Sequence, residues 1–349
     1  MTKFGLCAAL FGIAVASSLQ STPAAADSNN FAYVDARNGS NSNSSSGCPV
    51  TNPCADLNTA LSVITAGGTV QILVGGVFAP VVLTHSVNIF GTDPDADTVI
   101  MANSSASAGC IGAAAGTCGN NGFGIEIAAG ANDVVKLSHL MVTAGSSGNG
   151  ALKIDSAGSV SDTHSTFYGN ATTANPIVWI APSGTANLQV YMSHGEIAFN
   201  QAGGGLLVAP TGSAIAKLHF NHMEVHNANF GIRTDSSGLT TAGSVNTNVS
   251  ESEFFSFSGS AVTAFSSPTV GGSGPVLGVY NTVNILNTAG PAVNSNGAQS
   301  TVILTNSTVA GNQTGVRVIN GATLYTSLNN TIQGNGTEVV GTMTAAPLQ

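Results

Sequence analysis

The sequence predicts an all-β solenoid, in which each repeat of the chain adds one coil to a growing stack. Short apolar segments recur along the chain, separated by turns rich in Gly, Asn and Ser and with no helical pattern between them. Counted from the first apolar residue of each segment, the spacings are 27, 25, 29, 26, 30, 31 and 23 residues. The segments are anchored at Ile125, Leu152, Ile177, Leu206, Ile232, Val262, Val293 and Val316. A strand repeat of this length is typical of solenoids, so we expect any function on an elongated surface.

The composition fits this architecture. The 349 residues include 43 Gly and only 7% charged residues, while 43% are hydrophobic. Small turn residues and β-branched strand residues can stack on themselves, whereas so few charges cannot cover the exposed faces of helices. The net charge of -9 and the pI near 4.9 argue against nucleic acid or an anionic membrane as a partner, because both require basic patches.

Residues 1–26 have the features of a secretory signal peptide. A positive start at Lys3 precedes an apolar segment over residues 4–15 that is too short to span a bilayer, and Ala24 to Ala26 offer a small-residue cleavage site. We therefore expect an exported protein, extracellular or periplasmic, cleaved near Ala26. No later apolar stretch is long enough for a membrane span.

Four cysteines remain after cleavage, because Cys7 leaves with the signal peptide. Two close pairs in an exported chain favour local disulfides, Cys48 to Cys54 and Cys110 to Cys118, over the other two connectivities. A metal site is the rival interpretation, but neither a Cys-x-x-Cys nor a supporting His spacing is present.

The region before the coils, residues 27–68, is expected to form a loop and a capping helix. Leu57, Ala60, Leu61 and Ile64 fall on one helical face, and the helix should end at Gly67. Such a helix would cover the open end of the stack. Residues 69–349 should then form about ten coils as one domain, starting with strands at Thr69 to Val74, Pro80 to Leu83 and Val87 to Phe90.

Several local motifs resemble those of a known group of exported bacterial proteins. They are Tyr33-Val34-Asp35, the pair Cys48 and Cys54, Ala66-Gly67-Gly68-Thr69-Val70, Val87-Asn88-Ile89-Phe90-Gly91, and late runs such as Asn306 to Asn312 and Asn329 to Gly336. The chain is similar in these to right-handed parallel β-helix repeat proteins of the pectate-lyase-like superfamily. The resemblance implies a right-handed parallel β-helix, a fold that carries lyases, hydrolases, epimerases and adhesins.

The catalytic patterns of those enzymes do not transfer to this chain. The lyases need a basic residue beside calcium-holding carboxylates, and the few cations here lack an acidic cluster. The hydrolases need paired aspartates, of which the chain keeps none; it has only the fragments His194-Gly195 and Gly231-Ile232-Arg233.

Two columns of polar residues follow the repeat. His139, His164, His194 and His222 are spaced by 25, 30 and 28 residues, and Glu251 comes 29 residues later. Two positions on, a second column contains Met141, Thr166, Glu196, Glu224 and Glu253. Strand alternation makes the intervening residues point inward, so both columns should face solvent, with neighbouring His rings within roughly 5 Å.

Three interpretations of this face stay open. It is a solvated ladder inherited from a common repeat, a ligand surface for glycan hydroxyls or a divalent metal, or a catalytic site in which stacked glutamates repel and one pKa rises. The candidate ligand-binding residues are His164, His194, Glu196, His222, Glu224, Glu251 and Glu253, with Tyr191 nearby.

Two weaker metal signals are present. Asp93, Asp95 and Asp97 alternate in a loop and could begin a calcium site, although Thr98 and Ser104 depart from the EF-type pattern. His219, His222 and His226 have helical metal spacing, but in a strand they fall on different faces. We expect no other cofactor.

Taken together, these features predict a secreted or cell-surface protein that is non-catalytic, with glycan as the leading partner, or an adhesin-like rod. The alternative is a polysaccharide lyase or glycoside hydrolase. No catalytic residue and no oligomeric state can be assigned from the sequence.

Overall fold

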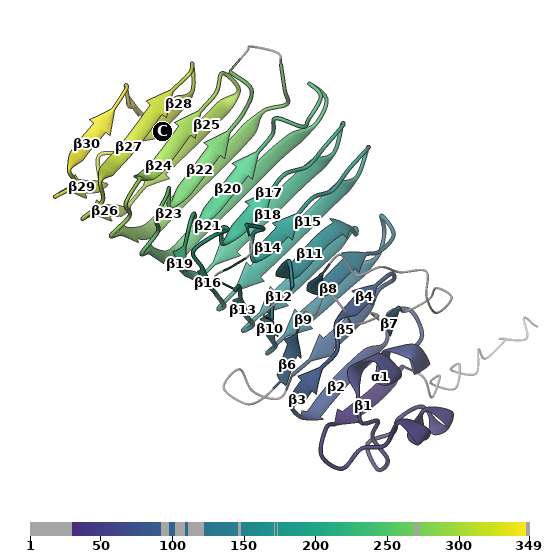
Figure 1. Ribbon diagram of the computed structural model, residues 1–349. Helices are drawn as coiled ribbons and strands as arrows, with labels where there is room; N and C mark the ends of the chain where they lie inside the picture. Colours follow the sequence, from purple (N-terminus) through teal and green to yellow (C-terminus); the bar gives the residue numbers. More distant parts are fainter. Residues whose placement is uncertain are drawn as a thin grey trace, which may run out of the picture.

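A computed structural model describes residues 30–91, 98–101, 109–110, 122–145, 148–170, 172, 174–268 and 272–346. The predicted signal peptide, the candidate calcium residues Asp93, Asp95 and Asp97, and Cys118 lie outside these residues. Within them, every strand pairing is parallel and joins one coil to the next, which gives the elongated stack seen in Figure 1. The parallel β-helix expected from the sequence is confirmed.

Each coil contributes to three stacks of strands. The first stack contains β1 (Phe31–Asp35), β2 (Thr69–Val74), β5 (Val87–Phe90), β9 (Val134–Ser138), β12 (Ser159–Thr163), β15 (Asn187–Ser193), β18 (Ile215–Asn221), the first parts of β21 (Ser244–Phe255) and β23 (Val276–Leu286), β25 (Ser300–Thr305), β28 (Thr323–Thr326) and β31 (Thr344–Ala345). The second stack contains β3 (Gly76–Phe78), β6 (Thr98–Met101), β10 (Met141–Thr143), β13 (Thr166–Tyr168), β16 (Glu196–Asn200), β19 (Glu224–Ala228), the last parts of β21 and β23, β26 (Thr308–Ala310) and β29 (Thr331–Gln333). Because β21 and β23 run through both stacks, these strands form one 20-stranded sheet.

The third stack is an 11-stranded sheet. It contains β4 (Val81–Leu83), β7 (Gly109–Cys110), β8 (Phe123–Ala128), β11 (Gly150–Ser156), β14 (Val178–Ile180), β17 (Leu206–Val208), β20 (Ile232–Asp235), β22 (Val262–Phe265), β24 (Pro291–Asn296), β27 (Thr314–Ile319) and β30 (Thr337–Val340). Alternate side chains of all three stacks point inward and form one continuous apolar core.

The apolar anchors chosen from the sequence lie in register in the third stack, with one exception. Leu206 pairs with Ile232 and Ile232 with Val262. Leu152, however, pairs with Val178 and not with Ile177, so that anchor was wrong by one residue. Ile177 is also fully buried, but it occupies the corner just before the strand.

The expected helix and one expected disulfide of the N-terminal region are present, but the helix ends at Val63 and not at Gly67. Helix α1 (Leu57–Val63) buries Leu57, Ala60 and Leu61 and lies against β1 and β2, where Figure 1 shows it at one end of the stack. Asp56 caps it by accepting a hydrogen bond from the backbone N–H of Thr59 at 2.6 Å. Beside it, the short helix η1 (Asn41–Ser46) precedes the Cys48–Cys54 disulfide. None of the helices in the described ranges is long and apolar enough to cross a membrane.

Candidate functional site

A single residue in the left-handed region makes the corner between the first and second stacks. Its φ is 55° at His139, 57° at His164, 55° at His194, 50° at His222 and 51° at Glu251. One residue with positive φ turns the chain sharply while keeping both flanking strands in their ladders, and His is among the side chains that tolerate this conformation best. The column predicted from the repeat spacing is therefore the corner of the solenoid.

The four histidine rings stack along this corner. Their centroids are 4.9 Å apart for His139 and His164, 4.9 Å for His164 and His194, and 4.7 Å for His194 and His222, with ring planes within 14° of parallel. These separations match the expectation of roughly 5 Å, because successive coils are one strand spacing apart. We call this row the histidine ladder.

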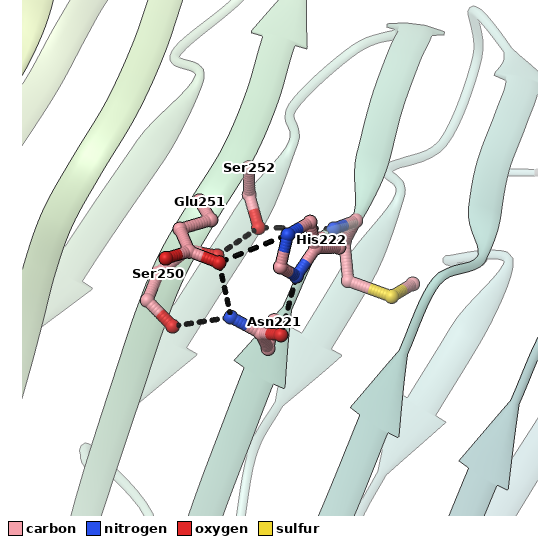
Figure 2. Close-up of polar contacts among 6 residues, drawn as sticks. Asn221, His222, Ser250, Glu251 and Ser252 are labelled. Carbon is pink, nitrogen blue, oxygen red and sulfur yellow. Dashed lines mark hydrogen bonds and ion pairs between the residues drawn. The ribbon is translucent and has the colours of Figure 1, made fainter.

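Neighbouring polar groups hold the ladder rings in place. The hydroxyls of Ser138 and Thr163 lie 2.6 and 2.8 Å from the Nδ1 atoms of the histidines that follow them. At the end of the row, Nε2 of His222 lies 2.9 Å from Oε2 of Glu251, and the amide of Asn221 donates to that carboxylate at 3.4 Å and to the hydroxyl of Ser250 at 2.9 Å (Figure 2). The ladder thus ends on a carboxylate.

The second predicted column is also in register. Met141 pairs with Thr166, Thr166 with Glu196, Glu196 with Glu224, and Glu224 with Glu253. The glutamates therefore lie beside the histidine ladder on the outer face of the second stack, one per coil. An open groove of about 340 Å³ lies between them, lined by His164, Thr166, His194, Gly195, Glu196, His222 and Glu224.

A third column, which the sequence reasoning missed, completes this face. His226 is almost fully buried, and its Nε2 lies 2.8 Å from Oε1 of Glu196 and 3.6 Å from Oε1 of Glu224. Tyr168 donates a hydrogen bond from its hydroxyl to Oε2 of Glu196 at 2.9 Å. One imidazole and one phenol therefore fix the position of Glu196, while the side chain of Glu224 remains 52% exposed.

These contacts set the protonation state of the cluster. The hydrogen bond from His226, with a further one from Tyr168, lowers the pKa of Glu196 below its usual 4.5 despite partial burial. Burial and the hydrogen bond to Glu196 raise the pKa of Tyr168 to about 12. Glu196 is therefore ionised at neutral pH. The expectation that repulsion between stacked glutamates raises one pKa is wrong for Glu196, because His226 and Tyr168 stabilise its charge.

Aromatic rings continue this third column across four coils. The ring centroids of Tyr168 and Phe199 are 5.3 Å apart, those of Phe199 and His226 are 5.4 Å apart, and those of His226 and Phe255 are 4.7 Å apart. Ala198, not an aromatic residue, occupies the in-register position between Tyr168 and His226. Phe199 fills the gap from the next position, with φ of 69° and 50% of its surface exposed. We call these four rings the aromatic strip.

The remaining sequence candidates are separated by the fold. His219 lies in β18, His222 at the corner and His226 in β19, so the three do not converge, and among the described residues no group of three or more His, Cys, Asp or Glu side chains is arranged to hold a metal ion. The fragment Gly231-Ile232-Arg233 lies in the third stack, where Arg233 pairs with Asp235 at 2.6 Å, far along the coil from His194. The hydrolase fragments therefore do not form one site.

Comparisons with known proteins found similar chains among solved structures alone, each at low sequence identity and with a TM-score below 0.5. No family model matches the chain, and no curated protein does. Among solved structures, a pectin methylesterase from Erwinia chrysanthemi is similar with 12% identity and a TM-score of 0.44, covering 74% of this chain and 80% of its own. The rice weevil pectin methyl esterase gives 14% identity and a TM-score of 0.40 over 83% and 82% of the two chains. A GH136 lacto-N-biosidase from Eubacterium ramulus gives 9% identity and a TM-score of 0.43 over 90% and 67%.

Proposed function

We propose that this protein is exported and binds a saccharide chain, without cleaving it, on the outer face of the second stack. The observation that carries the proposal is the aromatic strip lying beside the glutamate column, both running along the solenoid axis. The exposed ring of Phe199, supported by the partly buried rings of Tyr168 and Phe255, offers a flat apolar surface to the face of a sugar ring, and carboxylates accept hydrogen bonds from its hydroxyls. Because both columns repeat once per coil, the face suits an extended chain more than a single sugar.

Phe199 supports a binding role in a second way. A bulky side chain in the left-handed region is strained by about 1 kcal/mol or more, and such strain persists only where other interactions maintain it. Here the strain places a half-exposed ring between Tyr168 and His226. A ring held open to solvent at this cost is better explained by contact with a ligand than by packing.

The protonation state favours binding over hydrolysis. A glycosidase needs one carboxylic acid that keeps its proton near neutral pH, and the lowered pKa of Glu196 excludes that residue from the role. The groove beside it is open along the surface, whereas catalytic carboxylate pairs normally lie in a walled cleft.

A glycoside hydrolase is the second candidate, and one observation favours it. Glu196 and Glu224 both approach Nε2 of His226, so their Oε1 atoms are no farther apart than the sum of 2.8 and 3.6 Å. Retaining glycosidases place their two carboxyl groups about 5 Å apart. In that case Glu224 would have to be the acid, because Glu196 is ionised.

The test combines Phe199→Gly and Glu224→Gln with a glycan array and calorimetry on the best ligand found. Glycine removes the ring and relieves the left-handed strain, so we expect at least tenfold weaker binding with a nearly unchanged melting temperature. Glu224→Gln, at an exposed carboxylate, should weaken binding without loss of stability. Phe31→Ala, at an exposed ring outside the strip, is the matched control and should bind as the wild type does.

Two outcomes would contradict the proposal. Undiminished binding in both Phe199→Gly and Glu224→Gln would exclude this face as the ligand site. Release of new reducing ends from the bound glycan, lost in Glu224→Gln, would replace binding by hydrolysis as the function.

A further inference from the structure

The two faces that meet at the histidine ladder carry opposite charge. On the second stack the outward residues include Glu196, Glu224 and Glu253. On the first stack, from β9 to β23, the outward positions of the described strands contain no Asp or Glu, but they contain Lys136 and Lys217. In a chain of net charge -9, a sheet face without a carboxylate is a distinct feature.

Both lysines are available to a ligand. Neither Lys136 nor Lys217 makes a hydrogen bond or an ion pair with any residue that the structure describes, and both are exposed. By contrast, Lys153 pairs with Asp155 at 2.7 Å and Arg233 with Asp235 at 2.6 Å on the third stack. The two lysines of the described strands that lack a partner therefore both lie on the first stack, while Arg317 on the third stack donates a hydrogen bond to Asn294 at 3.0 Å.

Lys217 lies in the wall of a groove on this face. The groove has a volume of about 370 Å³ and is lined by Tyr191, Lys217, His219, Asn246, Asn248 and Leu277, among others. Tyr191 is 47% exposed, and its ring lies 6.3 Å from that of His219, tilted by 48°. In the next coil, Asn246 is in register with Lys217 and Asn248 with His219, so two amides follow directly after the cation and the rings.

These side chains define the chemistry of a ligand. Two rings at the groove wall suit the apolar face of a sugar, and the amides of Asn246 and Asn248 can both donate to and accept from hydroxyl groups. The ammonium of Lys217 needs an anion, because no carboxylate of the described strands is near enough to neutralise it. Two lysines on a whole face are too few for nucleic acid, which is bound by dense basic patches.

We infer that the groove around Tyr191, Lys217 and His219 is a second saccharide site, specific for a sugar that carries an acidic group. This goes beyond the proposed function, since the groove lies on the other side of the histidine ladder from the aromatic strip and takes a ligand of different charge. The acidic group is a carboxylate or a sulfate; both would accept hydrogen bonds from Lys217.

The test uses three hexasaccharides with the same β-1,4-glucan backbone: cellohexaose, its fully oxidised uronic acid form and its sulfated form. Calorimetry at about 0.15 M salt should show that the acidic hexamers bind at least tenfold more tightly than cellohexaose. Lys217→Gln should remove most of this preference, and Tyr191→Ala should weaken both acidic hexamers. Whichever of the two acidic hexamers binds more tightly to the wild type identifies the acidic group as a carboxylate or a sulfate.

Lys136→Gln is the matched control, because it removes the same charge from the same face but outside the groove. Lys136 precedes Tyr191 by two coils in the register, roughly 10 Å at the usual strand spacing, which exceeds the screening length at this salt concentration. The affinity of the Lys136→Gln variant for the acidic hexamers should change by less than twofold. Equal losses in Lys217→Gln and Lys136→Gln, or equal binding of neutral and acidic hexamers by the wild type, would overturn the inference. Neither result depends on the aromatic strip, which Phe199→Gly tests separately.

Discussion

Asp162 is the most informative single residue for the energetics of this fold, because it places a carboxyl group inside the apolar core. It lies in β12 at an inward position, in register with Leu137 on one side and Met192 on the other. Burial raises the pKa of Asp162 from 3.8 to about 7, and the neighbouring Ser165 and Thr163 offset this only in part. We predict that replacing it by Asn stabilises the protein at neutral and alkaline pH.

The magnitude and sign follow from linkage. Below about pH 4 the carboxyl is protonated in both the folded and unfolded chain, so it has no effect on pH dependence. Between about pH 4 and pH 7 only the unfolded chain loses the proton, and the folded state is progressively destabilised. The difference of about three pKa units corresponds to roughly 4 kcal/mol of lost stability above pH 7, of which about 3 kcal/mol accrues between pH 5 and pH 8.

Urea unfolding of the wild type and Asp162→Asn at pH 5 and pH 8 measures this loss of stability. The wild type should lose about 3 kcal/mol more than the variant on going from pH 5 to pH 8. Asp133→Asn is the control, because the hydroxyl of Ser86 lowers the pKa of that carboxyl, which is then ionised in both the folded and the unfolded chain from pH 5 to pH 8. This variant should keep the pH dependence of the wild type. Parallel pH dependence of the wild type and Asp162→Asn would show that Asp162 is not titrating in the core.

Three further substitutions test the ladder, the core and the disulfide. Burial, and then the neighbouring rings of His139 and His194, lower the pKa of His164 below 6.5. The folded protein therefore loses stability as the pH falls through 6.5. The His164→Asn variant should lose less stability than the wild type between pH 8 and pH 5, as measured by urea unfolding. Ile232→Asp puts an unpaired charge into the packed third stack and should cost at least about 3 kcal/mol, so an unaltered thermal unfolding curve would contradict the core assignment. Replacing both Cys48 and Cys54 by Ser should cost about 2 kcal/mol, read from the urea midpoint with and without reductant, and equal midpoints would show that the disulfide is not formed.

The repeat made part of the site predictable from sequence. A column of His or Glu residues at coil spacing has to form a row in space once the strands are in register, because each coil advances by one strand layer. The histidine ladder and the glutamate column follow from this rule alone. The left-handed conformation of the ladder residues did not follow, because His is not a residue that signals a turn as Gly does.

The aromatic strip could not be found by the same rule. Its members come from unequal positions: Tyr168 and His226 share a register, but the coil between them supplies Phe199, one residue later. In the sequence, His226 stands out only through its spacing from His219 and His222, which is typical of metal ligands on a helix, and Tyr168 belongs to no motif. A search for polar residues four positions after each ladder histidine would have found Tyr168 and His226, but not the left-handed conformation that brings in Phe199.

The error at Ile177 has a similar cause. The position before each third-stack anchor holds a small residue in the other coils, such as Ala151, Gly205 and Gly231, which the sequence pattern passes over. In one coil that position holds Ile177, which is apolar and buried like the strand residue Val178 that follows it. Periodicity cannot separate two adjacent buried apolar residues, so the register had to come from the structure.

The sharp corner explains how one narrow solenoid can carry two sites of opposite charge. A single left-handed residue turns the chain between Tyr191 and Glu196, so residues only five positions apart face different directions. Lysine on one side and glutamate on the other would neutralise each other on a flat sheet, but here the histidine ladder lies between them. The ladder separates the two grooves, because His164, His194 and His222 line the groove beside the glutamates, whereas no ladder histidine lines the groove around Lys217.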